Sequence, residues 1–213
     1  DIDIRDVITQ FSYLNIMNLC VDLPTINNVF CRQVDRDAAG HATAVRSFNI
    51  NASRMKARGI DFGARYHRRV GPGTLHVDFK GTYLLRQVVE TTPGMATGDV
   101  KYDGGYSDPR FRGTLFTGYD LGRVSIGLDT RFVSATTYDV NAQSRESYDN
   151  NSIPARVYND LSIRYDLGRG MSFGLGVNNL FNVYPPARPG VYEGSVYYDN
   201  IGRYVHANVK VKL

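Results

Sequence analysis

The side chains that catalysis would require are present in this sequence, but they are scattered. Serine, histidine and aspartate all occur, yet no nucleophile, base and orienting acid form a recognisable set, and the four histidines are dispersed. Nor do two carboxylates stand out as an acid and base pair. The alternating acidic and basic residues are explained more simply as ion pairs between neighbouring strands: Asp78, Asp129, Asp160, Lys80, Arg131 and Arg164. We therefore expect no enzyme and no cofactor.

The two cysteines, Cys20 and Cys31, both fall in the first long loop. In an exported protein the oxidising compartment favours a disulfide over two free thiols, and this bond would staple a surface loop. A metal site would need more ligands than lie nearby, since His41 is ten residues further on. The segment 35–40 faintly resembles a calcium-binding loop but lacks the later acidic ligands, so a plain turn is the better interpretation. We expect no metal.

The elements that carry these residues show a period of two. In residues 124–132, for example, Val124, Ile126 and Leu128 alternate with Ser125 and Asp129. Such alternation predicts strands with two different faces. The segments that show it are 60–67, 75–86, 110–121, 124–132, 156–167, 171–178 and 204–213, and residues 1–6 read as the end of a further strand. Asn159 is the one polar residue on the apolar side of its strand. This pattern fits either a soluble sheet packed on a core or a transmembrane barrel with lipid outside.

The connections between these segments alternate short and long along the chain. The short ones are 71–73, 121–123 and 167–170, and the long ones are 6–42, 91–109, 139–154 and 182–202. A chain that crosses a membrane back and forth puts its tight turns on one side and its long loops on the other. A soluble sandwich has no reason to sort its loops in this way. The connections therefore favour the barrel.

The composition agrees with a barrel. The chain has 25 basic and 21 acidic residues, which is only mildly cationic, and we expect no nucleic-acid partner. No apolar run is long enough to form a membrane-spanning helix, whereas a barrel dilutes its apolar residues with polar ones that face its interior. Four of the 15 tyrosines, Tyr66, Tyr83, Tyr119 and Tyr165, lie on apolar faces, where they could act as interfacial anchors.

Several segments taken together resemble a known family. They are Phe48–Asn51, Arg58–Phe62, Gly176–Asn182, Pro185–Pro186 and Tyr198–Arg203. Their order and spacing are similar to the C-terminal barrel of TonB-dependent outer-membrane receptors, and the likeness spans nearly the whole chain. The opening residues and the cysteine loop are similar to members of the family that carry such a loop. One departure is the last residue, Leu213, where the family usually ends on an aromatic residue.

The resemblance implies an all-β fold, an antiparallel transmembrane β-barrel with short periplasmic turns and long extracellular loops. Residues 1–213 would form about the last 8 strands of a 22-stranded barrel, without the plug domain and the TonB box. The implied function is energy-coupled uptake of a scarce ligand, such as a ferric siderophore, cobalamin or an oligosaccharide, across the bacterial outer membrane. The implied partners are membrane lipid, lipopolysaccharide, the plug and remaining barrel of the same receptor, and TonB acting through the plug.

Aromatic and basic residues of the long loops are the candidates for ligand contact. Flat rings offer rigid contact surfaces, and basic side chains could meet an anionic ligand or lipopolysaccharide. The candidates are Tyr106, Arg145, Tyr148, Arg188, Tyr192 and Tyr197. Their alternative role is to pack the loops against one another or simply to face solvent.

Two further interpretations stay open. One is a complete small eight-stranded barrel with a structural or adhesive role, whose interior is filled by its own charged side chains. The other is an outer-membrane enzyme, which would need catalytic residues gathered at the loop end of the barrel.

Overall fold

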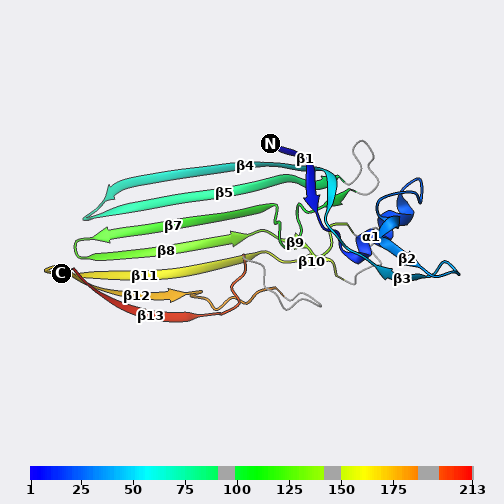
Figure 1. Cartoon of the computed structure of the whole chain (residues 1–213). Coiled ribbons are helices and arrows are strands. Elements are labelled where there is room, and N and C mark those ends of the chain that lie inside the picture. The colour runs from blue at the N-terminus through cyan, green and yellow to red at the C-terminus, as the bar shows by residue number, and fades with distance from the viewer. Residues whose placement is uncertain (91–98, 142–149, 187–196, 213) are drawn as a thin grey trace. The chain divides into compact units, whose positions relative to one another are not determined.

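The computed structural model of the chain describes residues 1–90, 99–141, 150–186 and 197–212 (Figure 1). The chain divides into two compact units. Unit 1 consists of Asp1–Arg58 and Arg86–Tyr102, and unit 2 consists of Gly59–Leu85 and Asp103–Leu213. Two long strands, β4 (Ile50–Val70) and β5 (Gly73–Glu90), contribute residues to both units.

Unit 1 contains the first strand and a small folded module. Strand β1 (Ile2–Thr9) pairs antiparallel with the first part of β4. The module consists of helix α1 (Tyr13–Asp22), the 3-10 turn η1 (Cys31–Gln33) and the hairpin of β2 (Val34–Arg36) and β3 (Ala42–Val45), while β6 (Val100–Lys101) pairs with the end of β5. The sequence analysis predicted a loop over 6–42, and that prediction misses the helix and the hairpin.

The helix in this module has a local cause. The Ser12 hydroxyl oxygen accepts the backbone N–H of Asn15 at 3.2 Å and so caps the first turn. Ile16, Leu19 and Cys20 follow at helical spacing and are buried on one face. Residues at helical spacing do not alternate with a period of two, which explains why alternation did not predict this helix.

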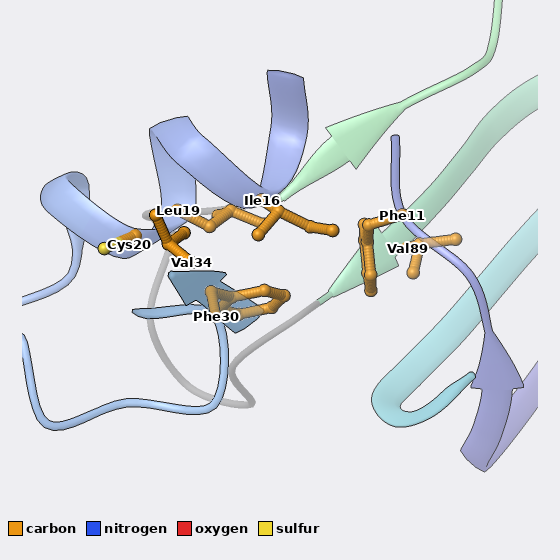
Figure 2. Close-up of a cluster of buried hydrophobic side chains, with 7 residues drawn as sticks. All are labelled: Phe11, Ile16, Leu19, Cys20, Phe30, Val34 and Val89. Atoms are coloured by element: carbon orange, nitrogen blue, oxygen red, sulfur yellow. The ribbon is translucent and has the colours of Figure 1, made fainter. Parts of the chain in front are cut away.

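The module has its own hydrophobic core, drawn in Figure 2. Its buried members are Phe11, Ile16, Leu19, Cys20, Phe30, Val34 and Val89. Phe11 meets Phe30 edge to face, with ring centroids 5.4 Å apart. Cys20 and Cys31 are joined by a disulfide, which links the end of α1 to η1. The first long connection is therefore folded around its own hydrophobic core and cross-linked by the disulfide.

Unit 2 holds the long antiparallel sheet. After β4 and β5 come β7 (Phe111–Leu121), β8 (Val124–Val133), β11 (Arg156–Gly168), β12 (Met171–Asn178) and β13 (Tyr204–Val211), each hydrogen-bonded to the one before it. Two short strands, β9 (Thr136–Thr137) and β10 (Ser152–Ile153), pair with each other. Each strand predicted from alternation is present. Strand β4, with 21 residues, is far longer than the predicted segment 60–67.

The three tight turns of unit 2 lie at the same end of the sheet, as Figure 1 shows. Gly71 and Gly122 adopt positive φ angles of 59° and 58°, which a glycine accepts without steric cost. The third turn, Gly168 to Gly170, is built the same way and places Arg169 at a φ of 53°. The predicted sorting of short and long connections is confirmed for these strands.

The pairing register gives the sheet one apolar face and one polar face. One row of facing residues across six strands is Val77, Thr117, Leu128, Leu161, Val177 and Val205. The adjacent row, one residue along each strand and so on the opposite side, is His76, Gly118, Gly127, Ser162, Gly176 and His206. We call the sides the apolar face and the charged face, because the second carries the lysines, arginines and aspartates described below.

The apolar face of unit 2 is open to the surroundings. Ile126, Phe173 and Val209 keep 44%, 42% and 67% of their surface exposed. A soluble sandwich would bury such a face against a second sheet, whereas in unit 2 this face is exposed. Among the described residues β13 pairs with β12 alone, and the sheet is not closed, which also departs from a complete small barrel. None of the described helices is long and apolar enough to cross a membrane.

Two polar exceptions on the apolar face, Asn159 of β11 and Thr130 of β8, are hydrogen-bonded to each other. Asn159 lies opposite Thr130 in the register, and the Thr130 hydroxyl donates to the Asn159 side-chain oxygen at 2.9 Å. A polar group that faces lipid is costly unless it is hydrogen-bonded. The two exceptions therefore satisfy each other.

Aromatic rings form a band across four strands of the apolar face. Phe62 stacks on Phe111 with centroids 6.1 Å apart, and Phe111 lies 5.5 Å from Phe132. Gly81 lies against these rings. A Cβ at this position would come within 2.8 Å of the Phe62 ring, so the ring packs where a glycine leaves room for it. Of the four predicted anchors, Tyr66, Tyr83 and Tyr165 are exposed in unit 2, whereas Tyr119 is half-buried and its hydroxyl donates to the Val70 carbonyl at 2.8 Å. Such bands mark the interfaces of membrane barrels.

Candidate functional site

The charged face of unit 2 contains a cavity of about 680 Å³, which we call the arginine cavity. Alternation along each strand decides which of the lining side chains point into it. They are Asp61 of β4, Lys80 and Thr82 of β5, Arg112 of β7, Arg131 of β8, and Tyr197, which precedes β13. The side chains thus come from four successive strands and from the last long connection.

Two arginines of this cavity each lie over a tyrosine ring. The guanidinium of Arg112 is 5.0 Å from the centroid of Tyr197 and donates a hydrogen bond to its hydroxyl. The guanidinium of Arg131 is 5.3 Å from the centroid of Tyr158. Arg131 is also 3.5 Å from the Asp160 carboxylate. Contact with an aromatic face restricts the guanidinium and leaves its edge free to donate hydrogen bonds.

The lining of the cavity carries more basic than acidic side chains. Its lining includes three cations and one carboxylate, and Asp61 already accepts a hydrogen bond from the Thr82 hydroxyl at 2.7 Å. Lys80 is 4.0 Å from Asp78, which is paired more closely with Arg65 at 2.8 Å. A cavity of this kind can hold an anionic group and can position it, but no lining residue offers an activated nucleophile.

Next to the cavity, tyrosines from the long connections meet in one buried cluster. Tyr106, from the connection before β7, stacks on Tyr198, from the connection before β13, with centroids 5.0 Å apart. Tyr158 of β11 is completely buried beside them, together with Val133 and Ile153. Burial raises the pKa of the Tyr198 hydroxyl above its usual value. The cluster ties the described parts of these connections to the sheet.

A turn at the end of β12 is fixed by two asparagines. Asn179 is fully buried at a φ of 49°, and its side chain both donates to the carbonyl of Val183 at 2.9 Å and accepts its N–H at 2.8 Å. The Asn179 N–H donates to the Asp160 carboxylate at 2.6 Å. Asn182 accepts the N–H of Arg203 at 3.0 Å, just before β13. The turn therefore sets where the last connection leaves and re-enters the sheet.

Nearer the tight turns, the charged face forms a second groove of about 640 Å³. Its floor is the row of small residues between His76 and His206. His76 stacks on His67 with centroids 4.6 Å apart, and it lies 2.8 Å from the Asp120 carboxylate. Nowhere in the described ranges do three or more histidine, cysteine or acidic side chains gather as a metal-binding group.

The predicted ion pairs of the charged face form in part. Asp78 and Asp160 have basic partners, as described above. Asp129 lies opposite Asp160 in the register. The Arg164 guanidinium lies 3.4 Å from the Ser125 hydroxyl, where the sequence predicted an acidic partner. These contacts depend on which residues face one another across neighbouring strands. The sequence alone does not determine that pairing register.

Of the predicted ligand residues, the structure describes two. Tyr197 lines the arginine cavity, whereas Tyr106 is 6% exposed and packs against another loop tyrosine. The other candidates, Arg145, Tyr148, Arg188 and Tyr192, lie outside the described residues. Ligand contact by these residues stays a prediction.

The residue types alone did not distinguish Arg112, and their alternation with acidic residues predicted only ion pairs for Lys80 and Arg131. Alternation did place all three on the charged face of their strands. Their convergence around one cavity follows from the pairing register of β5, β7 and β8, in which Lys80 faces Thr114 and Thr114 faces Arg131. Alternation alone carries no such information.

Comparison with known proteins gives a consistent result. A family model described as TonB dependent receptor-like, beta-barrel, matches residues 1–180. No curated protein matches the sequence. Several solved structures are similar in fold.

Three of these structures represent the set. The ferric enterobactin receptor PfeA of Pseudomonas aeruginosa is 16% identical, with a TM-score of 0.53 over 84% of this chain and 26% of that one. The FrpB iron transporter of Neisseria meningitidis is 16% identical, with a TM-score of 0.54 over 98% of this chain and 27% of that one. The pyoverdine receptor FpvA of P. aeruginosa, bound to pyoverdine, is 16% identical, with a TM-score of 0.54 over 99% and 26%. The chain thus spans about a quarter of the length of these relatives.

Proposed function

The chain belongs to the TonB-dependent receptor β-barrel family, and from this premise we propose that it forms part of the wall of a bacterial outer-membrane receptor that imports a scarce ligand. Family and structural neighbours are receptors and transporters of the outer membrane, not enzymes. In the proposal the plug domain and the other barrel strands belong to the same receptor, and TonB acts through the plug.

The observation that carries the proposal is the sheet with two unlike faces. Its apolar face is exposed and banded with aromatic rings, which suits contact with lipid and with lipopolysaccharide at the rim. Its charged face holds a cavity of about 680 Å³, which suits a wet interior where a small molecule is held.

For the ligand, a ferric siderophore has the most support. The solved relatives include receptors named for ferric enterobactin and pyoverdine and an iron transporter. The excess of basic over acidic side chains in the lining of the arginine cavity also suits an anionic ligand better than a neutral one. Cobalamin and oligosaccharides are the other candidates.

The test is uptake by cells that produce the intact protein that carries this chain. Radiolabelled ferric enterobactin, ferric pyoverdine, cobalamin and a maltooligosaccharide are offered separately, with and without a protonophore. We expect one of them, a ferric siderophore first, to accumulate, and the protonophore or loss of TonB to abolish accumulation. Accumulation that is indifferent to both treatments would contradict energy-coupled uptake, and failure of all four ligands would contradict the proposed range.

A further inference from the structure

Among the described residues, one cation of the arginine cavity has no carboxylate as an ion-pair partner. Among the ion pairs between described residues, Arg131 approaches Asp160 and Lys80 approaches Asp78, whereas Arg112 has no carboxylate within 4.0 Å. Its one described polar contact is the neutral hydroxyl of Tyr197. Arginine donates to oxyanions through two parallel N–H groups, so Arg112 retains capacity for a second, charged partner.

The register fixes how far apart the backbones of the three basic residues lie. Arg112 faces Val133, two residues from Arg131 on the same strand, so the two arginines are diagonal neighbours. Such neighbours have backbones roughly 7–8 Å apart. Lys80 faces Thr114, which faces Arg131, so Lys80 and Arg131 stand on alternate strands, roughly 10 Å apart. The three residues thus emerge from the sheet within about 10 Å of one another, a span that a small molecule can bridge.

The tyrosines restrict the two arginines. Tyr158 is completely buried, so the ring beneath Arg131 is held in place by the sheet and the tyrosine cluster. Tyr197 both faces the Arg112 guanidinium and accepts its hydrogen bond. A guanidinium held in this way loses less conformational freedom when it binds a planar oxyanion, whereas a lysine offers a mobile point charge.

We propose that the arginine cavity binds a ligand with two or more planar oxyanion groups, such as carboxylates, through Arg112 and Arg131, with Lys80 adding charge and Tyr197 positioning Arg112. The inference rests on the proposed function, since it names the ligand chemistry of that receptor's interior. The cavity volume of about 680 Å³ leaves room for such a ligand.

The test uses a defined probe and the intact protein that carries this chain, purified in detergent. Benzene-1,3,5-tricarboxylate presents three planar carboxylates, and benzene-1,3,5-tricarboxamide is a neutral molecule of the same shape. Isothermal titration calorimetry at low salt measures both. We expect the tricarboxylate to bind at least about tenfold more tightly than the triamide, and salt to weaken its binding.

Matched variants assign the residues. Arg112→Gln and Arg131→Gln should each weaken tricarboxylate binding about tenfold or more, and Arg112→Lys should also weaken it although the charge remains. Arg164→Gln is the control, because that arginine faces the same side of the sheet but lies outside the cavity. Tyr197→Phe keeps the ring but loses the hydroxyl that accepts from Arg112, so it should weaken binding less than Tyr197→Leu, which loses both.

The inference is overturned if the tricarboxylate and the triamide bind alike, or if Arg164→Gln weakens binding as much as Arg112→Gln. Heat-modifiable migration of each variant shows that the barrel is folded. The uptake assay separates the two proposals. Energy-coupled uptake that persists unchanged in the Arg112→Gln, Arg131→Gln double variant would refute the inference and leave the proposed function standing. Tricarboxylate binding by a protein that takes up none of the four ligands would refute the proposed function and leave the inference standing.

Discussion

Replacement of Asn179 should loosen the turn at the end of β12, and the structure allows the effect to be divided into two parts. The first part is hydrogen bonding, since the side chain makes two bonds to Val183, at 2.9 and 2.8 Å, from a fully buried position. The second part is backbone strain, since residue 179 has a φ of 49°. Asparagine tolerates this left-handed region, glycine occupies it freely, and alanine does not.

The magnitudes follow from these contacts. Loss of the two bonds should cost about 1–3 kcal/mol, because each is worth about 0.5–1.5 kcal/mol net. Asn179→Gly loses only these bonds. Asn179→Ala also places a Cβ in the left-handed region, which adds about 1–2 kcal/mol. We therefore expect Asn179→Ala to destabilise the turn by about 2–5 kcal/mol and Asn179→Gly by about 1–3 kcal/mol.

The assay is hydrogen exchange with mass spectrometry on the intact protein, for a peptide that covers residues 178–184. Exchange should accelerate in both variants, and more in Asn179→Ala, at about tenfold for each 1.4 kcal/mol. Asn178→Ala is the control, because it changes the neighbouring asparagine, which takes no part in the turn. Equal exchange in all three variants would refute the assigned role of Asn179.

Three further predictions address other parts of the chain. Leu128→Arg should destabilise the barrel by about 2–4 kcal/mol if the residue lies near the bilayer midplane, and Asp129→Asn should have little effect; urea unfolding in lipid vesicles measures both. Alkylation of unreduced, denatured protein should label neither Cys20 nor Cys31, and mass spectrometry would reveal labelled thiols if the loop is not stapled. Burial and, secondarily, Glu90 raise the pKa of the Asp99 carboxyl, so its ionised form destabilises unit 1 at neutral pH. The penalty is relieved as pH falls through the raised pKa, and Asp99→Asn should therefore slow proteolysis of unit 1 at pH 7 but not in acid.

Alternation predicted the strands of this chain because the pattern within one strand does not depend on which strand lies beside it. Val124, Ile126 and Leu128 reveal an apolar face without any knowledge of the neighbouring strand. The tight turns followed from glycines whose positive φ a hairpin requires. The two-faced sheet and the family were therefore accessible from the sequence.

The arginine cavity was not accessible in the same way. Its position depends on which residue faces which across β5, β7 and β8, and a shift of one residue would move Arg131 to the opposite face. The helical module was missed for a different reason. Ser12, Ile16 and Leu19 carry a helix signal with a period near four, which lay within a segment interpreted only as a connection.

The most direct test of the central claim is the accessibility of successive residues of β8 in the membrane. Nitroxide labels placed singly at positions 125, 126, 128 and 129 of the intact protein, in lipid vesicles, are relaxed by oxygen, which concentrates in lipid, or by a water-soluble nickel complex. We expect labels at Ile126 and Leu128 to respond to oxygen, whereas labels at Ser125 and Asp129 should respond to the nickel complex. Equal access of the nickel complex to all four positions would contradict a strand that separates lipid from a wet interior.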